Sequence, residues 1–302
     1  SYAWSTTSIQ TDSQAINLVA GMYYVTVTDG NNCSTVDSVF VTEPTPIDLV
    51  MDSTNISCFN FSNGKAWITA SGGVGGFNYS WLTTPNPSTD TLSNVSAGFY
   101  KVYVTDANNC LDSSFVNLTE PDTLAFTFTP DSVVCYNGNE GSILTNTIGG
   151  TGDYTYQWSS TTIDTNNIFN LIAGIYTLTV TDDNSCISID SVEIGEPEPF
   201  VLTLTQHPPT CHDGNDGWAS VTTSGGIQPH NIVWNIPTMP TTDTIFNLVG
   251  GIYYSVTGTD ANGCITTDSI LVVNPDSLII SMTGTDEACQ QGNNGTTTAT
   301  VS

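Results

Sequence analysis

The residues with the clearest capacity for chemistry are eight cysteines at a regular spacing. The gaps between successive cysteines are 25, 52, 25, 51, 25, 53 and 25. The pattern therefore recurs about every 77 residues. Many cysteines beside little other reactive chemistry indicate disulfide bonds made in an oxidising compartment. The cysteines are Cys33, Cys58, Cys110, Cys135, Cys186, Cys211, Cys264 and Cys289.

Metal binding is a weaker hypothesis for the same residues. The chain has no C-x-x-C pair, and its histidines, His207, His212 and His230, do not recur between repeats. Calcium takes about six to eight oxygen ligands, which Asp-rich turns can supply. Asp and Asn more often cap such turns with their own side chains, so we favour caps, keep calcium as the alternative and expect no other cofactor. The turns have the pattern T-D-x-N-x-C and contain Asp29, Asp106, Asp182 and Asp260.

Catalysis and nucleic-acid binding are both disfavoured by composition. No single group of nucleophile, base or paired carboxylates stands out, because the acidic residues recur once per repeat, so an enzyme is not expected. The net charge is −27, with Lys65 and Lys101 as the only basic residues. Phosphate contacts need Lys and Arg, so we expect no nucleic-acid partner. Apolar runs are too short for a membrane span, so no membrane insertion is expected in this segment.

Other landmarks keep the cysteine period. They include Y-x-W pairs such as Tyr79/Trp81, prolines after each turn, and a G-x-Y element. That element occurs at Gly21/Tyr23, Gly98/Tyr100, Gly174/Tyr176 and Gly251/Tyr253. Repetition at a fixed period marks stacked structural units, and we expect a piece of a longer array. The predicted divisions are a partial repeat at 1–44, complete repeats at 45–121, 122–197 and 198–275, and the start of a further repeat at 276–302.

Each repeat has the pattern of an all-β domain. Strand-forming residues dominate and helical periodicity is absent. In the second repeat, we expect strands near 49–51, 66–70, 79–81, 100–104 and 114–118, with one or two more in 83–97. About seven short strands predict immunoglobulin-like or fibronectin-III-like β-sandwiches of about 77 residues, arranged as an elongated rod. We expect Trp81 in the core, a tyrosine corner at Tyr100, and Tyr24 and Tyr254 as candidate exposed aromatics.

The sandwich topology bears on the disulfide pairing. Cys58 lies between the first two strands of its repeat and Cys110 lies between the last two, at opposite ends of such a sandwich. A strand of that length spans roughly 20 Å, whereas bonded cysteines have Cα atoms within about 7 Å. We therefore favour bonds between neighbouring repeats, Cys58–Cys186 and Cys135–Cys264. The open alternative is pairing within each repeat, which would give Cys58–Cys110, Cys135–Cys186 and Cys211–Cys264.

Two stretches resemble the SprB-type repeat found in giant surface proteins of Bacteroidetes, including gliding-motility adhesins. They are residues 170–186, with the sequence NLIAGIYTLTVTDDNSC, and 211–217, with the sequence CHDGNDG. The resemblance implies secretion and display on the cell surface. It also implies O-linked glycans on D-[S/T]-apolar motifs, against the simpler interpretation of ordinary strand sequence. The candidate positions are Ser38, Thr91, Thr123, Ser132, Ser191, Thr244, Ser269 and Ser277.

The leading functional hypothesis is a structural stalk or filament segment of a long secreted adhesin that supports adhesion or gliding. Its partners would be neighbouring repeats of the same chain and other copies in a fibre. The alternative is a modular array that binds polysaccharide or another surface ligand. A binding array should repeat an exposed aromatic or polar cluster, whereas the features that recur here are those expected of a core and its turns.

Overall fold

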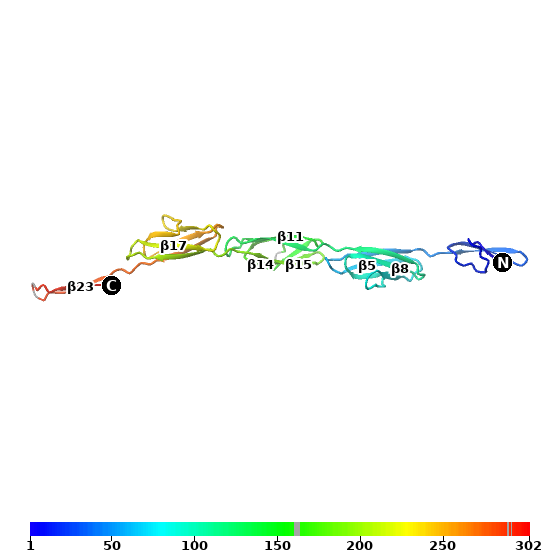
Figure 1. Ribbon diagram of the computed structural model, residues 1–302, viewed down its shortest axis with the longest axis horizontal. Helices are drawn as coiled ribbons and strands as arrows, with labels where there is room; N and C mark the ends of the chain where they lie inside the picture. The colour runs from blue at the N-terminus through cyan, green and yellow to red at the C-terminus, as the bar shows by residue number, and fades with distance from the viewer. Residues whose placement is uncertain (160–163, 289, 291) are drawn as a thin grey trace. The chain divides into compact units, whose positions relative to one another are not determined.

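The chain folds into β-strands throughout the residues that the structure describes. The computed structural model describes residues 1–159, 164–288, 290 and 292–302. Its contacts divide the chain into two units. Residues 1–125, 148–153 and 182–186 form the first, and residues 126–147, 154–181 and 187–302 form the second. Figure 1 shows the strands of both units along the chain, coloured from the N-terminus to the C-terminus.

The segment 45–121 contains six strands in two sheets. One antiparallel sheet has the order β4-β5-β7 and the other has the order β6-β8-β9. The strands are β4 (Ile47–Thr54), β5 (Gly64–Gly72), β6 (Asn78–Trp81), β7 (Thr91–Val95), β8 (Gly98–Thr105) and β9 (Leu111–Leu118). The sequence predicted about seven strands, with one or two in the stretch 83–97. That stretch contributes one strand, β7, and is otherwise bends and irregular backbone, so the segment has six.

Two further segments repeat this arrangement. The segment 122–197 forms sheets β10-β11-β13 and β12-β14-β15, and 198–275 forms sheets β16-β17-β19 and β18-β20-β21. The first set is β10 (Ala125–Asp131), β11 (Gly141–Ile148), β12 (Tyr154–Trp158), β13 (Ile168–Leu171), β14 (Gly174–Asp182) and β15 (Ile187–Ile194). The second set is β16 (Val201–His207), β17 (Gly217–Ser224), β18 (Asn231–Trp234), β19 (Thr244–Leu248), β20 (Ile252–Thr259) and β21 (Ile265–Val272).

The terminal segments contain fewer strands. At the N-terminus, β1 (Tyr2–Trp4), β2 (Gly21–Thr28) and β3 (Ser34–Val41) form one sheet. At the C-terminus, β22 (Ile280–Thr285) pairs with β23 (Thr296–Val301) as an exposed hairpin. Among the described residues, neither segment has a second sheet of its own.

The core of segment 45–121 follows from the two-residue period of its strands. Val102 and Val104 on β8 are fully buried, while the residue between them, Tyr103, points the other way. Ala66 and Ile68 on β5 alternate in the same manner and pack with them from the second sheet. Because alternate residues face opposite sides of a strand, each sheet buries one apolar face against the other. The all-β immunoglobulin-like sandwich predicted from the sequence is therefore confirmed.

A buried tryptophan ends the first strand of the second sheet in each of these three segments. Its indole N–H donates a hydrogen bond to a threonine carbonyl in the connection that follows, so burial leaves no indole donor unpaired. The three bonds are Trp81 to Thr89, Trp158 to Thr165 and Trp234 to Thr242, each 3.0 Å long. The core position predicted for Trp81 is confirmed, since it is 0% exposed.

A glycine begins the second strand of each segment, where the pairing register shifts by a bulge. A Cβ on Gly64 would lie 2.8 Å from the carbonyl oxygen of Val95, closer than side-chain carbons approach backbone. The equivalent distances are 2.9 Å for Gly141 and 3.0 Å for Gly217. Glycine therefore ends the cysteine-bearing loop because the neighbouring strand approaches too closely for a side chain.

The predicted tyrosine corner is confirmed. The Tyr100 hydroxyl donates a hydrogen bond to the carbonyl oxygen of Ser96 at 2.9 Å. Tyr23 and Tyr176 make the same contact with the residue four positions earlier, also at 2.9 Å. This bond ties the start of the strand to the connection that leads into it, so the two sheets are joined at that corner.

In segment 198–275, the corner tyrosine is one residue later than the sequence pattern placed it. Tyr254 donates to the carbonyl oxygen of Val249 at 3.3 Å, whereas Tyr253 is 69% exposed. Ile252 pairs with Val272 in the register that Gly98 takes in its own repeat. An extra residue between β19 and β20 therefore shifts the strand. The expectation that Tyr254 is exposed is therefore wrong, since it is half-buried against the core, whereas Tyr24 is exposed as expected.

The buried tryptophan gives a direct test of the sandwich. Replacing Trp81 with alanine should destabilise segment 45–121 by roughly 3–5 kcal/mol, because it removes a large side chain from a close-packed core. Val50→Ala is the matched control, since Val50 is exposed on β4 and should change stability by less than about 0.5 kcal/mol. Hydrogen exchange of the β6 and β8 amides, measured by mass spectrometry, reports both effects. Equal exchange in the two variants would contradict the assigned core.

Candidate functional site: the disulfide-linked joints

Two disulfides connect residues far apart in the sequence. Cys58 is bonded to Cys186 across 128 residues, with Cα atoms 5.7 Å apart. Cys135 is bonded to Cys264 across 129 residues, with Cα atoms 5.6 Å apart. The first bond lies within the first unit and the second within the second unit. These are the two pairs that the sequence favoured, and in the structure these four cysteines do not pair within their own repeats.

Each bond joins the same two kinds of segment. One is the connection between the first two strands of a repeat, called here the cysteine loop. The other is the turn between its last two strands, called here the cysteine turn. The cysteine loops are residues 55–63, 132–140 and 208–216, and the cysteine turns are residues 106–110, 182–186 and 260–264. We call a bonded loop and turn a joint.

An aspartate holds each cysteine turn in shape. Asp106 Oδ1 accepts hydrogen bonds from the amides of Asn108 and Cys110, both at 2.9 Å. Its Oδ2 accepts from the amide of Val74, at 3.1 Å, in the glycine-rich loop after β5. Asp106 is 2% exposed, so these bonds replace those that water would make. Asp182 and Asp260 make the equivalent three bonds.

These contacts are the turn-capping role that the sequence analysis favoured for the T-D-x-N-x-C aspartates. Asp29 also caps its turn, accepting from the amides of Asn31 and Cys33 at 2.8 and 2.9 Å. Within the described ranges, no group of three or more His, Cys, Asp or Glu residues is arranged to hold a metal ion. The aspartate carboxylate thus serves as the hydrogen-bond acceptor that holds the turn in shape.

The cysteine turn also depends on the protonation state of its aspartate. Burial alone would raise the pKa of Asp106, but the three amide hydrogen bonds outweigh burial and hold the pKa below its ordinary value. The same balance lowers the pKa of Asp260. The ionised carboxylate is therefore the form that stabilises the fold.

Each cysteine loop is held against the end of its own repeat. Asn60 donates its amide hydrogen to Glu120 Oε2 at 2.7 Å, and Asn137 donates to Glu196 Oε2 at 2.9 Å. Both asparagines have a positive φ, 60° and 58°, a conformation that asparagine tolerates better than most residues. Glu120 and Glu196, each followed by a proline, thus fix these two loops. From the sequence, only the prolines that follow these glutamates were noted as recurring landmarks.

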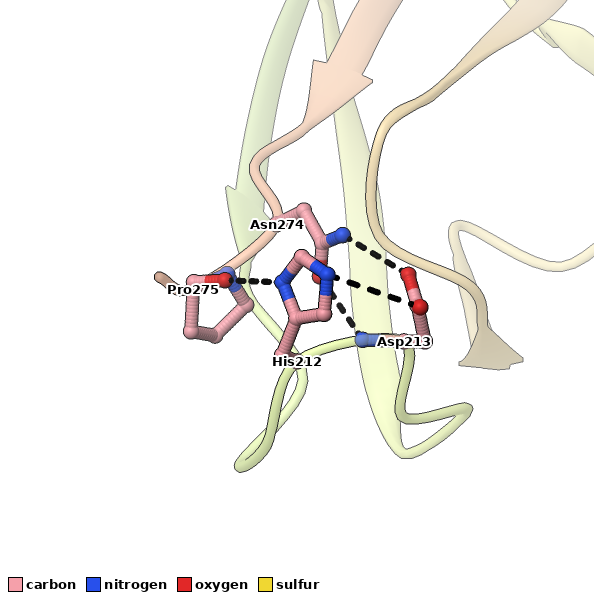
Figure 2. Close-up of polar contacts among 4 residues, drawn as sticks. All are labelled: His212, Asp213, Asn274 and Pro275. Atoms are coloured by element: carbon pink, nitrogen blue, oxygen red, sulfur yellow. Dashed lines mark hydrogen bonds and ion pairs between the residues drawn. The ribbon is translucent and has the colours of Figure 1, made fainter. Parts of the chain in front are cut away.

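The third cysteine loop uses different residues for the same attachment, as Figure 2 shows. Asp213 donates its amide hydrogen to Asn274 Oδ1 at 3.0 Å, and Asn274 Nδ2 donates back to Asp213 Oδ1 at 3.0 Å. His212 Nδ1 lies 2.7 Å from the carbonyl oxygen of Pro275, and its Nε2 lies 3.5 Å from Asp213 Oδ2. His212 therefore has a local role beside Cys211.

The asparagine of the T-D-x-N-x-C pattern makes a second contact across each joint. Asn184 Nδ2 donates a hydrogen bond to the carbonyl oxygen of Ser57 at 3.1 Å, and Asn262 Nδ2 donates to Val134 at 3.0 Å. The Sγ atoms of the turn cysteines lie 3.4 and 3.5 Å from the same two carbonyl oxygens. This contact was not apparent from the sequence, in which the asparagine was interpreted only as a turn residue.

The remaining cysteines are unpaired or outside the described residues. Cys33, Cys110 and Cys211 are free and exposed. Cys289 lies outside the described residues. The other two histidines do not meet at a site, since His207 stacks on Trp218 and His230 packs against Phe200.

The candidate glycosylation positions are dispersed over the strands and loops. Ser38, Ser191 and Ser269 are exposed on β3, β15 and β21, and each donates its amide hydrogen to the preceding aspartate. Three others are exposed and two are half-buried. The exposed ones are Thr123, Ser132 and Ser277, and the half-buried ones are Thr91 and Thr244. The structure therefore does not bring these positions into one cluster.

The cysteine loops lie in stretches that match a known family of repeats. The family model of the SprB repeat matches residues 51–86, 127–162 and 203–239. Three stretches of the chain are thus similar to the SprB repeat. Each SprB match begins in the first strand of a repeat and includes its cysteine loop, whereas the cysteine turn follows the matched residues. The resemblance predicted from the sequence is therefore confirmed.

Solved structures with tandem immunoglobulin domains are similar to the chain at low identity. The eight N-terminal immunoglobulin domains of Down Syndrome Cell Adhesion Molecule match with 10% identity and a TM-score of 0.28, covering 95% of this chain and 57% of that one. Titin domains I67–I69 match with 15% identity and a TM-score of 0.38, covering 77% and 99%. No match was found among curated proteins. In the part of the chain described, no helix is long and apolar enough to cross a membrane.

The aspartate of the cysteine turn gives a test with a defined sign. Asp106→Asn should lower the melting temperature at neutral pH, because it removes the ionised acceptor. Since the folded pKa is below the ordinary value of about 3.9, this contribution is present above that value and is lost as pH falls through the folded pKa. Calorimetry from pH 7 to pH 3 should therefore show the wild-type and variant melting temperatures converging at low pH.

The exposed Asp112, in the same repeat, provides the control. Asp112→Asn should leave the melting temperature nearly unchanged across the same pH range. A deficit for Asp106→Asn that persisted undiminished at pH 3 would show that the side-chain charge is not what stabilises the turn.

Proposed function

We propose that this chain is a structural segment of a secreted, adhesin-like cell-surface protein, in which disulfide joints hold successive SprB repeats together under tension. The observation that carries this proposal is the recurrence of one joint. A cysteine loop is bonded to a cysteine turn 128 residues away in one case and 129 residues away in the other. The asparagine contact is also the same in both. A feature repeated with the period of the chain serves the array rather than any single repeat.

The composition of the chain and its match to the SprB repeat both support a location at the cell surface. SprB repeats point to a cell-surface protein, and disulfides persist in oxidising compartments outside the cytosol. The net charge of −27 favours solubility and discourages non-specific association with other acidic surfaces. Support of adhesion or gliding is the finer form of the proposal, in which the segment carries load between a cell and an adhesive region.

The two bonds change the covalent path along the chain. The intervals 58–186 and 135–264 overlap, so the shortest route from Cys58 to Cys264 crosses both bonds and includes only the backbone between Cys135 and Cys186. Without the bonds, the route follows the whole backbone from Cys58 to Cys264, which is about four times as long when extended. The bonds therefore limit how far the chain can extend even when every sandwich has unfolded.

Single-molecule stretching measures this limit. At about 3.4 Å per residue, the stretch between Cys58 and Cys264 should extend to about 170 Å when oxidised and about 700 Å when reduced. A thiol reductant should produce the longer extension, and reoxidation with a small-molecule disulfide such as oxidised glutathione should restore the shorter one. Equal contour lengths in the oxidised and reduced chains would refute load-bearing joints.

A variant with one joint provides the matched control. Replacing Cys58 and Cys186 with serine leaves only the bond from Cys135 to Cys264, so the shortest route then includes the backbone from position 58 to Cys135. The expected extension is about 260 Å, between the other two values. This intermediate length separates the contribution of each bond from a general effect of reduction.

We also propose that the exposed D-[S/T]-apolar positions accept O-linked glycans. Ser38, Ser191 and Ser269 support this proposal because they occupy equivalent, exposed places on the last strand of their repeats. Mass spectrometry of peptides from the native protein should then show added glycan mass at these serines, whereas peptides from a host without O-glycosylation should match the bare sequence. Unmodified native peptides at all of these positions would exclude glycans on them.

A further inference from the structure

One cysteine turn and one cysteine loop of the complete repeats are not bonded in a joint. Cys110 holds the position in its turn that Cys186 and Cys264 hold in theirs. Cys211 holds the position in its loop that Cys58 and Cys135 hold in theirs. Among the described residues, neither has a cysteine at the offset of 128 or 129 positions that separates the bonded pairs. Both thiols are free and exposed.

The Cys110 turn already has the shape found in the bonded joints. The Cys110 amide donates to Asp106 Oδ1 at 2.9 Å, the distance found at both bonded turn cysteines. Asn108 stands where Asn184 and Asn262 donate to a cysteine loop, and in the described part of the chain its side-chain amide has no hydrogen-bond partner. The turn therefore presents a thiol and a donor in the arrangement that binds a cysteine loop elsewhere in the same chain.

A groove lies beside Cys110 and corresponds to one in a bonded joint. Its walls include Pro44, Thr45, Pro46 and Gly73, with Asp106 and Cys110. The joint at Cys264 has a groove with the corresponding residues. These are Pro197, Glu198, Pro199 and Gly226, with Asp260 and Cys264. At Cys264, Cys135 and Tyr136 of the bonded cysteine loop also line the groove. The groove at Cys110 has no cysteine-loop residues along its wall in the described part of the chain.

We propose that the Cys110 turn and its groove form a docking site for the cysteine loop of another SprB repeat, and that the Cys211 loop of a second copy of this chain can occupy it. Asn108 Nδ2 then donates to the carbonyl oxygen of Thr210 in the second copy, and a disulfide forms between Cys110 and Cys211. A small-molecule disulfide such as oxidised glutathione accepts the two electrons and two protons and leaves as two thiols. The proposal rests on the joints described for the proposed function and extends them to separate chains.

Cys33 provides a natural comparison within the chain. It is also a free, exposed cysteine in a T-D-x-N-x-C turn, and Asp29 caps that turn in the same way. The sheet β1-β2-β3 that bears it has no second sheet among the described residues, so the walls formed by Pro44 to Pro46 and Gly73 have no equivalent there. Docking predicts that Cys110 reacts in preference to Cys33, whereas random oxidation of exposed thiols predicts that both react.

The test uses the full chain with Cys289→Ser, kept at high concentration in a glutathione redox buffer. Non-reducing electrophoresis should show a ladder of dimers, trimers and higher species, because a loop at one repeat and a turn at another permit head-to-tail growth. Peptide mapping should identify Cys110–Cys211 as the main new cross-link. Cys110→Ser or Cys211→Ser should abolish the ladder, and Cys33→Ser should leave it unchanged.

Asn108→Ala separates docking from simple thiol proximity. Losing one hydrogen bond of ordinary strength should slow ladder formation about five-fold. A ladder of mixed or symmetric cross-links involving Cys33 equally, or one insensitive to Asn108→Ala, would overturn the docking site. The same peptide maps report Cys58–Cys186 and Cys135–Cys264, so a failure of docking with both bonds intact is distinguishable from a failure of the joints themselves.

Discussion

A carboxylate buried in a turn is the interaction on which the rest of this structure depends. In each complete repeat, one aspartate connects the amides of its own turn to an amide of the glycine-rich loop from the other sheet. The turn cysteine is fixed by one of those bonds, and the asparagine that contacts the cysteine loop is fixed by another. Without the aspartate, the thiol and the asparagine amide would have no defined positions, and a disulfide requires Cα atoms within a few ångströms.

The chemistry of the joints suits a strongly acidic chain. Charges of one sign repel each other, and a net charge of −27 with two lysines leaves almost no ion pairs to offset that repulsion. Many carboxylates instead accept backbone hydrogen bonds, as Asp106 and Glu120 do. A covalent bond between cysteines does not weaken with salt or net charge. It is therefore a consistent means of holding such a chain together.

The fold was largely predictable because its determinants are local and periodic. Alternating apolar residues, buried tryptophans and corner tyrosines specify the strands and their core in each copy. The corner at Tyr254 was misplaced because an extra residue between β19 and β20 moves the strand without changing the G-x-Y letters, and only the pairing register reveals it. The count of about seven strands per repeat was one too high, because the stretch 83–97 forms one strand, β7, and is otherwise bends and irregular backbone.

The joints were only partly predictable. The spacing of the cysteines and the geometry of a sandwich favoured the correct partners for Cys58 and Cys135. The roles of Asn184 and Glu120 were not visible, because their contacts are with backbone groups, and a backbone amide or carbonyl leaves no pattern of residue types. Such residues can be recognised from a sequence only by their recurrence, after the fold has shown which segments meet.

The overlap of the two bonds has a directional consequence for the middle repeat. Along the shortest covalent path, the backbone between Cys135 and Cys186 is traversed from its C-terminal end to its N-terminal end. Cys135 follows β10 in one sheet and Cys186 follows β14 in the other. Force transmitted through the bonds would thus enter the middle repeat beside one sheet and leave it beside the other, while the backbone of that repeat outside Cys135 and Cys186 stayed slack.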